Sequence, residues 1–143
     1  MNEEIQFVAF SLGNEEYAVD ILSVQEIIRS AEITRVPKAP PFVRGVSNLR
    51  GNIIPIVDSH LRLNLPADGN EGGVKRIIVF RLDESPIGMT VDHVTEVLSL
   101  TGENIETPQA MNNIDKNFIK GIGKTGDRLL IILELKNVLN IGI

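Results

Sequence analysis

The stretch FVRGVSNLRGNIIPIVDSHLRL, at residues 42–63, returns near the end of the chain as FIKGIGKTGDRLLIILELKNVL, at residues 118–139. The two stretches align without a gap, with a phenylalanine, a glycine and a dense apolar run at the same positions. A second pair agrees, because FVAFSLGNEEYAVDILSVQEII at residues 7–28 resembles IIVFRLDESPIGMTVDHVTEVL at residues 77–98. The sequence therefore predicts one structural unit that is used twice.

Length and composition favour a β fold in one domain. Each repeat is near the lower limit for burying its own core, so we expect two interlocked subdomains, with repeat halves at roughly residues 1–70 and 71–143. Of the 143 residues, 43% are hydrophobic but only 4% are aromatic, which leaves Ile, Val and Leu to build the core and favours strands. The net charge of −5 is spread evenly and offers no basic face for a nucleic acid.

Cysteine content and hydropathy indicate the compartment. The chain contains no cysteine, which excludes disulfides, thiolate nucleophiles and cysteine metal sites. No apolar run approaches the roughly 20 residues that span a bilayer, and the start MNEEIQF lacks the basic residues of a signal peptide. We therefore expect a cytoplasmic protein.

Alternating apolar residues predict β-hairpins. In the first repeat they flank a turn at residues 13–16, and a Gly-containing turn at residues 50–52 leads into the dense apolar strand 53–57. The linker PADGNEGG at residues 66–73 separates the repeats. Short strands without βαβ alternation predict a mainly β fold of two small five-stranded barrels, which hide the edges of their sheets.

Helices are expected to be few and short. The segment SVQEII, at residues 23–28, places its apolar residues at helical spacing after a serine, which predicts a short helix there. Asp58 is predicted to cap a last helical turn that ends near Leu63.

Candidate catalytic residues do not form a functional set. The segment DSH, at residues 58–60, contains the residue types of a hydrolytic triad, but neighbours in sequence do not converge as a triad requires. His93 is expected on the surface, and the acidic pairs at residues 15–16 and 83–84 fall in turns, where solvated charge is the ordinary interpretation. We therefore expect no enzyme, no cofactor and no metal ion.

Four segments together resemble a known family. They are FSLGNEEYAVDILSVQEII at residues 10–28, ITRVPKAPPFVRG at residues 33–45, GVSNLRGNIIPIVD at residues 45–58 and GDRLLIILELKNVL at residues 126–139. This combination resembles the CheW family, the coupling proteins of bacterial chemotaxis, over nearly the whole chain. The regulatory domain of the kinase CheA is similar in fold, but 143 residues leave no room for the other modules of that kinase.

The resemblance implies a fold and a function. The fold would be two SH3-like five-stranded β-barrel subdomains around a shared hydrophobic interface. The function would be that of a non-catalytic adaptor that joins methyl-accepting chemoreceptors to the histidine kinase CheA, recruited to membrane-associated receptor arrays. The groove between the subdomains would take the helical tip of the receptor, and the barrel ends would pair with the regulatory domain of the kinase.

The resemblance also assigns partner contacts, without dividing them between receptor and kinase. The assigned residues are Val24, Glu26, Gly45 and Arg50. Two further apolar residues lie beside the proline-rich loop and either line the receptor groove or seal a barrel, and these are Ile33 and Val36.

The duplication leaves structural roles open for three of these residues. Val24, Glu26 and Gly45 recur in the second repeat as Val94, Glu96 and Gly121. Gly45 is expected to serve backbone geometry first, at a position with no room for a Cβ. Arg50 differs, since its counterpart is a glycine, and this asymmetry favours a contact with a partner. The alternative hypothesis is a small β-barrel enzyme or ligand-binding protein with its site between the repeats.

Overall fold

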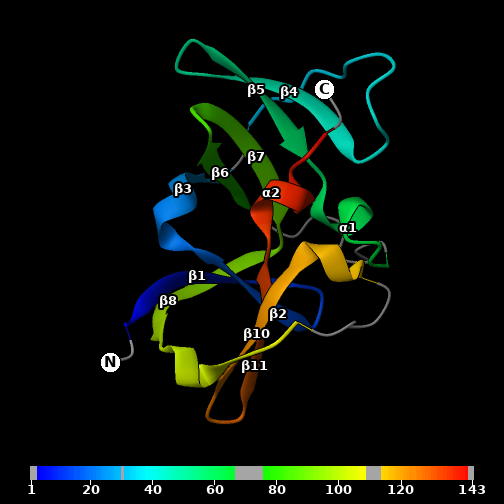
Figure 1. Cartoon of the computed structure of the whole chain (residues 1–143). Helices are drawn as coiled ribbons and strands as arrows, with labels where there is room; N and C mark the ends of the chain where they lie inside the picture. The colour runs from blue at the N-terminus through cyan, green and yellow to red at the C-terminus, as the bar shows by residue number, and fades with distance from the viewer. Residues whose placement is uncertain (1–2, 30, 67–75, 109–113, 142–143) are drawn as a thin grey trace.

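The structure is a computed structural model that describes residues 3–29, 31–66, 76–108 and 114–141. Strands dominate it, and the helical elements are single turns (Figure 1). In chain order the elements are β1 (Ile5–Leu12), β2 (Glu15–Asp20), η1 (Ile21–Ser23), β3 (Val24–Ile28), β4 (Val43–Leu49), β5 (Asn52–Val57), α1 (Ser59–Arg62), β6 (Arg76–Leu82), β7 (Ser85–Val91), β8 (His93–Leu100), η2 (Gly102–Asn104), β9 (Ile105–Glu106), η3 (Lys116–Phe118), β10 (Ile119–Thr125), β11 (Arg128–Leu133) and α2 (Leu135–Val138). In these ranges no helix has the length and apolar character needed to cross a membrane.

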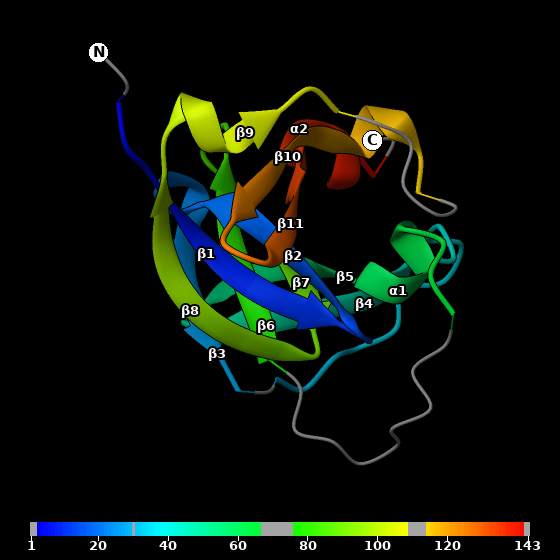
Figure 2. The same ribbon diagram turned by 90° about the horizontal axis from the view of Figure 1, so that it is seen from below.

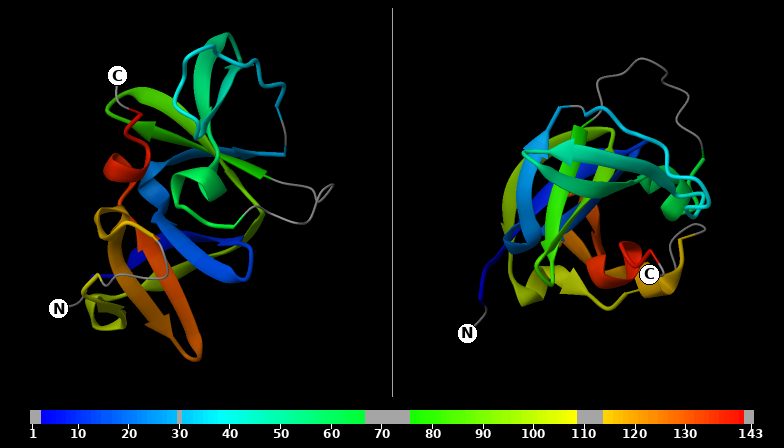
Figure 3. Two further views of the ribbon diagram at one scale, coloured as in Figure 1. Left: turned by 90° about the vertical axis from the view of Figure 1, so that its right-hand side faces the viewer. Right: turned by 90° about the horizontal axis from the view of Figure 1, so that it is seen from above.

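The strands form two sheets. One has six strands in the order β8-β1-β2-β11-β10-β9, and the other has five in the order β3-β6-β7-β5-β4. The two sheets occupy opposite ends of the molecule, with α1 and α2 at the waist between them (Figure 1, Figure 3). Viewed from below, the six-stranded sheet curls from β8 through β1 and β2 towards β11 (Figure 2).

This architecture confirms the predicted mainly β fold with two SH3-like barrels. The six-stranded barrel exceeds the expected five strands by β9, a two-residue strand that pairs with β10. A segment at the same position of the first repeat stays an isolated bridge, in which Thr34 pairs with Val46 of β4. Each of these segments covers an otherwise open sheet edge, which reduces the exposure of unpaired backbone groups.

The internal duplication is visible in the strand pairing. Hairpin β1–β2 corresponds to hairpin β6–β7, and Phe10 and Phe80 hold the same place in them, opposite Tyr17 and Ile87. The hairpins β4–β5 and β10–β11 correspond in the same way. The predicted equivalence of Phe10 and Phe80 is therefore confirmed.

The equivalence of Phe42 and Phe118 is confirmed by their hydrogen bonds. The carbonyl oxygen of Phe42 accepts the backbone N–H of Asp58 at 2.7 Å, and that of Phe118 accepts the N–H of Glu134 at 2.8 Å. In both repeats this bond fixes the backbone where the last strand ends and the helical turn begins.

The first hairpin of each repeat joins the barrel of the other repeat. Strands β1 and β2 lie between β8 and β11, which belong to the second repeat, while β6 and β7 lie between β3 and β5 of the first. The joints β2–β11 and β5–β7 are parallel, whereas the other pairings are antiparallel. Each barrel therefore contains strands from both repeats, so the sheets do not coincide with halves 1–70 and 71–143.

The exchange explains why the first strand of each repeat is an unbroken apolar run. In β1, Phe7 and Ala9 point into the six-stranded barrel, while Val8 and Phe10 join a larger core between the two barrels. Strand β6 repeats this division with Ile77 and Val79 inside the five-stranded barrel and Ile78 and Phe80 in the shared core. A strand that is buried on both faces needs apolar residues at consecutive positions.

The predicted helix over residues 23–28 is wrong. The single turn η1 precedes it, capped by Asp20, whose carboxylate accepts the N–H of Leu22 at 2.9 Å. Residues Val24–Ile28 then form β3, which pairs with β6. The β-branched residues of this segment suit a strand, and the free edge of β6 supplies the hydrogen bonds that a five-residue helix lacks.

The predicted turn at Asp58 is confirmed. Its carboxylate accepts the N–H of Leu61 at 3.2 Å and caps α1. The linker predicted at residues 66–73 lies mostly outside the described residues.

Candidate functional site

Arg50 lies at the tip of hairpin β4–β5, at the open end of the five-stranded barrel. Its φ of 53° is followed by a φ of 87° at Gly51, and the carboxamide oxygen of Asn48 accepts the N–H of Gly51 at 3.0 Å. These two left-handed residues make a tight hairpin turn that leaves the Arg50 side chain 74% exposed.

Glu26 brings a second predicted residue to the same place. It sits on β3 opposite Val79, and residues opposite each other across a pair of strands share a face, so its side chain lies on the inner face of the barrel. One carboxylate oxygen pairs with the guanidinium of Arg50. The other, Oε1, is buried and has no hydrogen-bond partner among the described residues, and the side chain as a whole is 17% exposed.

The exposed part of this pair is the guanidinium of Arg50, whereas the carboxylate of Glu26 is largely buried beneath it. The guanidinium has five N–H donors, and most of them face solvent. The mouth of the five-stranded barrel therefore presents N–H donors to a partner surface that offers hydrogen-bond acceptors.

The remaining four predicted residues lie on β3, on β4 and in the segment before β4. Val24 packs against the shared core, and Ile33 packs against the core of the five-stranded barrel. Gly45 is buried beneath the backbone of Thr34, whose carbonyl oxygen would lie 2.2 Å from a Cβ at that position. Val36 is 41% exposed beside the same segment.

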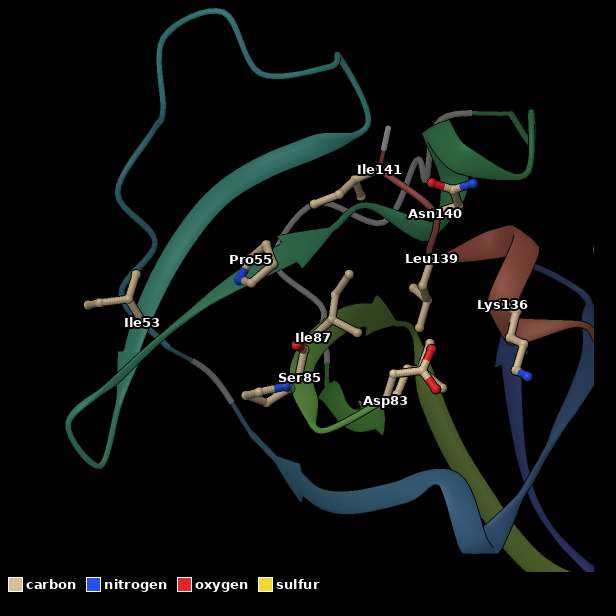
Figure 4. A pocket seen from close by; sticks show the side chains of 11 residues that line it. Ile53, Pro55, Asp83, Ser85, Ile87, Lys136, Leu139, Asn140 and Ile141 are labelled. Atoms are coloured by element: carbon tan, nitrogen blue, oxygen red, sulfur yellow. The ribbon is translucent and has the colours of Figure 1, made fainter. Parts of the chain in front are cut away.

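A groove lined by both apolar and polar side chains runs along the boundary between the five-stranded barrel and the C-terminal segment. Its volume is about 630 Å³. Its walls come from β5, the β6–β7 turn, α2 and the residues that follow α2, and Figure 4 shows their side chains around the hollow. The lining residues are Ile53, Pro55, Leu82, Asp83, Ser85, Pro86, Ile87, Lys136, Leu139, Asn140 and Ile141. We call this hollow the seam groove.

A smaller hollow of about 140 Å³ continues the seam groove towards η1. The two hollows share Leu82 and Lys136, and the smaller one extends past Asp20 and Ser23. Leu22, between those two residues, is 90% exposed. The two hollows together therefore form one extended surface of mixed polar and apolar lining rather than one enclosed cavity.

A cation of α1 holds the two repeats together at the waist. The guanidinium of Arg62 lies 4.2 Å from the ring centre of Phe42 and 4.7 Å from that of Phe118. It donates to the carbonyl oxygens of Val138 at 2.6 Å and of Asn137 at 2.9 Å, and burial lowers the pKa of Arg62. This contact was not predicted from the sequence. Arg62 aligns with Val138 in the second repeat, and this difference between the repeats could have indicated a special role for Arg62.

A second charged cluster lies in the six-stranded barrel. The guanidinium of Arg128 donates to both carboxylate oxygens of Glu16, at 2.9 and 3.1 Å, and also pairs with Glu96. The bond from Arg128 holds the pKa of Glu16 below its usual range, and the same pairs raise the pKa of Arg128. The sequence predicted a solvated carboxylate at Glu16, and the structure shows instead that this carboxylate is paired with Arg128. Glu96, the counterpart of Glu26, again pairs with an arginine of the facing hairpin.

Residues 58–60 do not assemble into the triad that their residue types suggested. His60 donates from Nδ1 to the carbonyl oxygen of Pro66 at 2.9 Å, and its Nε2 lies 3.1 Å from the carboxylate of Asp92. Asp58 caps α1 instead of meeting this ring, and His93 is exposed as expected. Within the described ranges no three metal-ligating side chains of His, Asp or Glu come together.

Comparisons with known proteins give one family. The sequence profile of the family described as CheW-like domain matches residues 6–141. The chain is 40% identical over 139 residues to the chemotaxis protein CheW of Klebsiella aerogenes, covering 94% of this chain and 81% of that protein. It is 37% identical over 140 residues to the chemotaxis protein CheW of Helicobacter pylori, covering 96% and 84% respectively.

A solved structure agrees with these sequence matches. The scaffolding protein TtCheW of Thermoanaerobacter tengcongensis superposes with a TM-score of 0.87 at 35% sequence identity. The superposition covers 98% of this chain and 90% of that one.

Proposed function

The chain belongs to the CheW-like family, and we propose that it is a non-catalytic adaptor that couples chemoreceptors to the histidine kinase CheA in bacterial chemotaxis. Its relatives from Klebsiella aerogenes and Helicobacter pylori carry the name chemotaxis protein, and its structural neighbour is named a scaffolding protein. The proposal places the protein in the cytoplasm as one CheW-like domain of two interlocked subdomains, recruited to receptor arrays at the membrane.

The mouth of the five-stranded barrel is the proposed contact with the regulatory domain of the kinase. The observation that carries this assignment is the pair of Arg50 and Glu26, in which an exposed guanidinium adjoins a buried carboxylate oxygen that lacks a donor. Arginine is enriched at the centres of interfaces because its planar fork makes several bonds. Val24 and Gly45 would shape this surface from below, and Ile33 and Val36 would extend it along the loop before β4.

The seam groove is the proposed contact with the cytoplasmic tip of the receptor. An amphipathic helix binds by laying its apolar face into a groove, and the seam groove offers apolar side chains such as Pro55, Ile87 and Leu139 for that face beside polar ones for its edges. Because the groove and the barrel mouth are separate surfaces, one molecule would bind both partners at once, as an adaptor must.

The test of the kinase contact compares three substitutions. Arg50→Ala should weaken binding of the isolated regulatory domain of the kinase from the same bacterium by about thirtyfold, the loss typical of an interface hot spot. The free energy of unfolding should fall by only about 1 kcal/mol, because Arg50 is exposed but its guanidinium pairs with the largely buried carboxylate of Glu26. Ile54→Ala should instead lower that free energy by about 2–5 kcal/mol, because Ile54 is buried in the small core of its barrel.

Lys116→Ala provides the matched control, since it removes an exposed cation from the other repeat. It should change neither binding nor stability. If Arg50→Ala binds the kinase domain as strongly as wild type, the assignment of the barrel mouth is wrong.

The alternative hypothesis, an enzyme or a small-ligand protein with a site between the repeats, gains no support from the relatives reported above. It remains open to a direct test by thermal shift with nucleotides and divalent metal ions. A saturable, stoichiometric stabilisation by any of these compounds would count against the adaptor.

A further inference from the structure

The β6–β7 turn borders the seam groove and has an unusual backbone. Asp83 has a φ of 48° and Glu84 a φ of 71°, so two consecutive residues with side chains occupy the left-handed region. The other three hairpin turns of the described residues each place a glycine at a left-handed position, and these glycines are Gly13, Gly51 and Gly126. The corresponding turn of the first repeat is the one that contains Gly13.

The left-handed conformation is unfavourable for residues with a Cβ, and two in succession are uncommon. Asn-Gly is the pair that hairpin turns of this kind prefer. Strained residues of this sort gather at functional sites, where the side chains have a use that offsets the cost. The identity of the two side chains, rather than the shape of the turn, is therefore the feature that needs an explanation.

Both side chains are acidic and free to meet a partner. Asp83 and Glu84 are exposed, and neither makes an ion pair with another described residue. The Asp83 side chain points into the groove, towards Leu139, and Ile87 lies on the neighbouring wall (Figure 4). An apolar segment that filled the groove would therefore bring its flank against a carboxylate.

We propose that the β6–β7 turn determines which helix the seam groove accepts. The occupant is an amphipathic receptor helix whose apolar face fills the groove and whose Lys or Arg side chain, at the edge of that face, pairs with Asp83 and Glu84. This inference rests on the proposed function of the groove as the receptor contact. A helix with an acidic residue at that position is rejected, because like charges repel at a partly desolvated interface.

One double variant distinguishes the effect of the two charges on binding from the effect of backbone strain on stability. Asp83→Asn with Glu84→Gly removes both carboxylates and installs the preferred turn pair. The thermal unfolding midpoint should rise by about 2–4 °C, because backbone strain is relieved. The affinity for a soluble helical hairpin that contains the cytoplasmic tip of a chemoreceptor from the same bacterium should fall by about tenfold. A variant that is more stable yet binds less cannot owe its loss to unfolding.

A control and a reversal complete the experiment. Asp127→Asn removes a carboxylate from the exposed β10–β11 turn, outside the groove lining, and should leave the affinity unchanged. Asp83→Lys should weaken binding of the wild-type hairpin further. Replacement of one basic residue of the hairpin by Glu should weaken its binding to the wild-type protein and restore its binding to the Asp83→Lys protein.

The outcomes distinguish this inference from the proposed function. If the wild-type protein does not bind the receptor hairpin, the groove is not the receptor contact, and the inference is overturned with it. If the wild type binds and the double variant binds equally well, the inference alone is wrong. If the double variant loses affinity for the kinase regulatory domain and not for the hairpin, the occupant belongs to the kinase, and the assignment to a receptor helix is overturned.

Discussion

Gly45 lies where β4 passes directly beneath the preceding loop. The N–H and carbonyl of Val46 both bond to the backbone of Thr34, at 2.9 and 2.8 Å, which pulls the two segments together. A Cβ on Gly45 would lie 2.2 Å from the carbonyl oxygen of Thr34, and the φ of 149° is itself unfavourable for other residues. Gly45→Ala should therefore lower the free energy of unfolding by about 1–3 kcal/mol or more, measured by urea denaturation.

Gly102→Ala is the control for that substitution. A Cβ at residue 102 would meet nothing within 4 Å, and its backbone is not left-handed. We expect a change within about 0.5 kcal/mol. Wild-type stability of Gly45→Ala would mean that the loop before β4 does not approach as closely as described.

At the level of elements, Arg62 joins α1 to α2. Its guanidinium stacks between Phe42 and Phe118 and donates to carbonyl oxygens at the end of α2. Arg62→Lys should lower the free energy of unfolding by about 1–3 kcal/mol, because an ammonium cannot stack on two rings and reach several carbonyls at once. Arg62→Ala should cost at least as much. Full stability of the lysine variant would show that charge alone suffices.

The cluster of Glu16 and Arg128 links β2 to β11, and therefore one repeat to the other. Because the folded-state pKa of Glu16 is lowered, its contribution to stability is present above the ordinary glutamate pKa of about 4.3 and is lost as the pH falls through the lowered value. Glu16→Gln should therefore lower the free energy of unfolding at neutral pH, and this loss of stability should become smaller as the pH falls. Urea denaturation at about pH 7 and about pH 3 would measure this.

Glu103→Gln, at an exposed position of η2, should have little effect at either pH. If Glu16→Gln destabilises equally at both values, the charge of Glu16 is not the source of its contribution.

Elements with local signals could be predicted from the sequence, and elements that depend on distant partners could not. Alternation and turn glycines correctly indicated the hairpins around Gly13 and Gly51, and Asp58 indicated the cap of α1. Strand β3 was misread as a helix because its apolar spacing fits both structures, and only its pairing with β6 decides. Of the candidate site, Arg50 was proposed from its asymmetry in the repeat alignment, whereas its meeting with Glu26 depends on barrel closure and is matched in the second repeat by the pair of Arg128 and Glu96.

At the scale of the molecule, neither repeat is a structural unit by itself. A chain of residues 1–66 contains β1 and β2 without β8 and β11, and a chain of residues 76–143 contains β6 and β7 without β3 and β5. We expect each fragment alone to lack cooperative unfolding, and the two mixed in equal amounts to regain strand content by circular dichroism. Cooperative unfolding of either fragment alone would contradict the exchange of hairpins.

The exchange also explains what the duplication could not reveal. Similarity between repeats shows that two units share a structure, but a hairpin that packs on its own repeat and one that packs on the other have the same sequence signature. The choice is fixed by long-range pairings such as Ile5 with Leu100, which leave no local pattern in one sequence. The prediction of two barrels was therefore correct, but the sequence could not predict which strands belong to which barrel.

These pairings impose an order on the synthesis of the protein. Strand β1 is synthesised before the strands that flank its hairpin, so Ile5 must wait for Leu100, and Glu16 for Leu130, before either edge of the β1–β2 hairpin is covered. The apolar strands of this hairpin therefore stay open to chaperones and to neighbouring chains until β8 and β11 have left the ribosome.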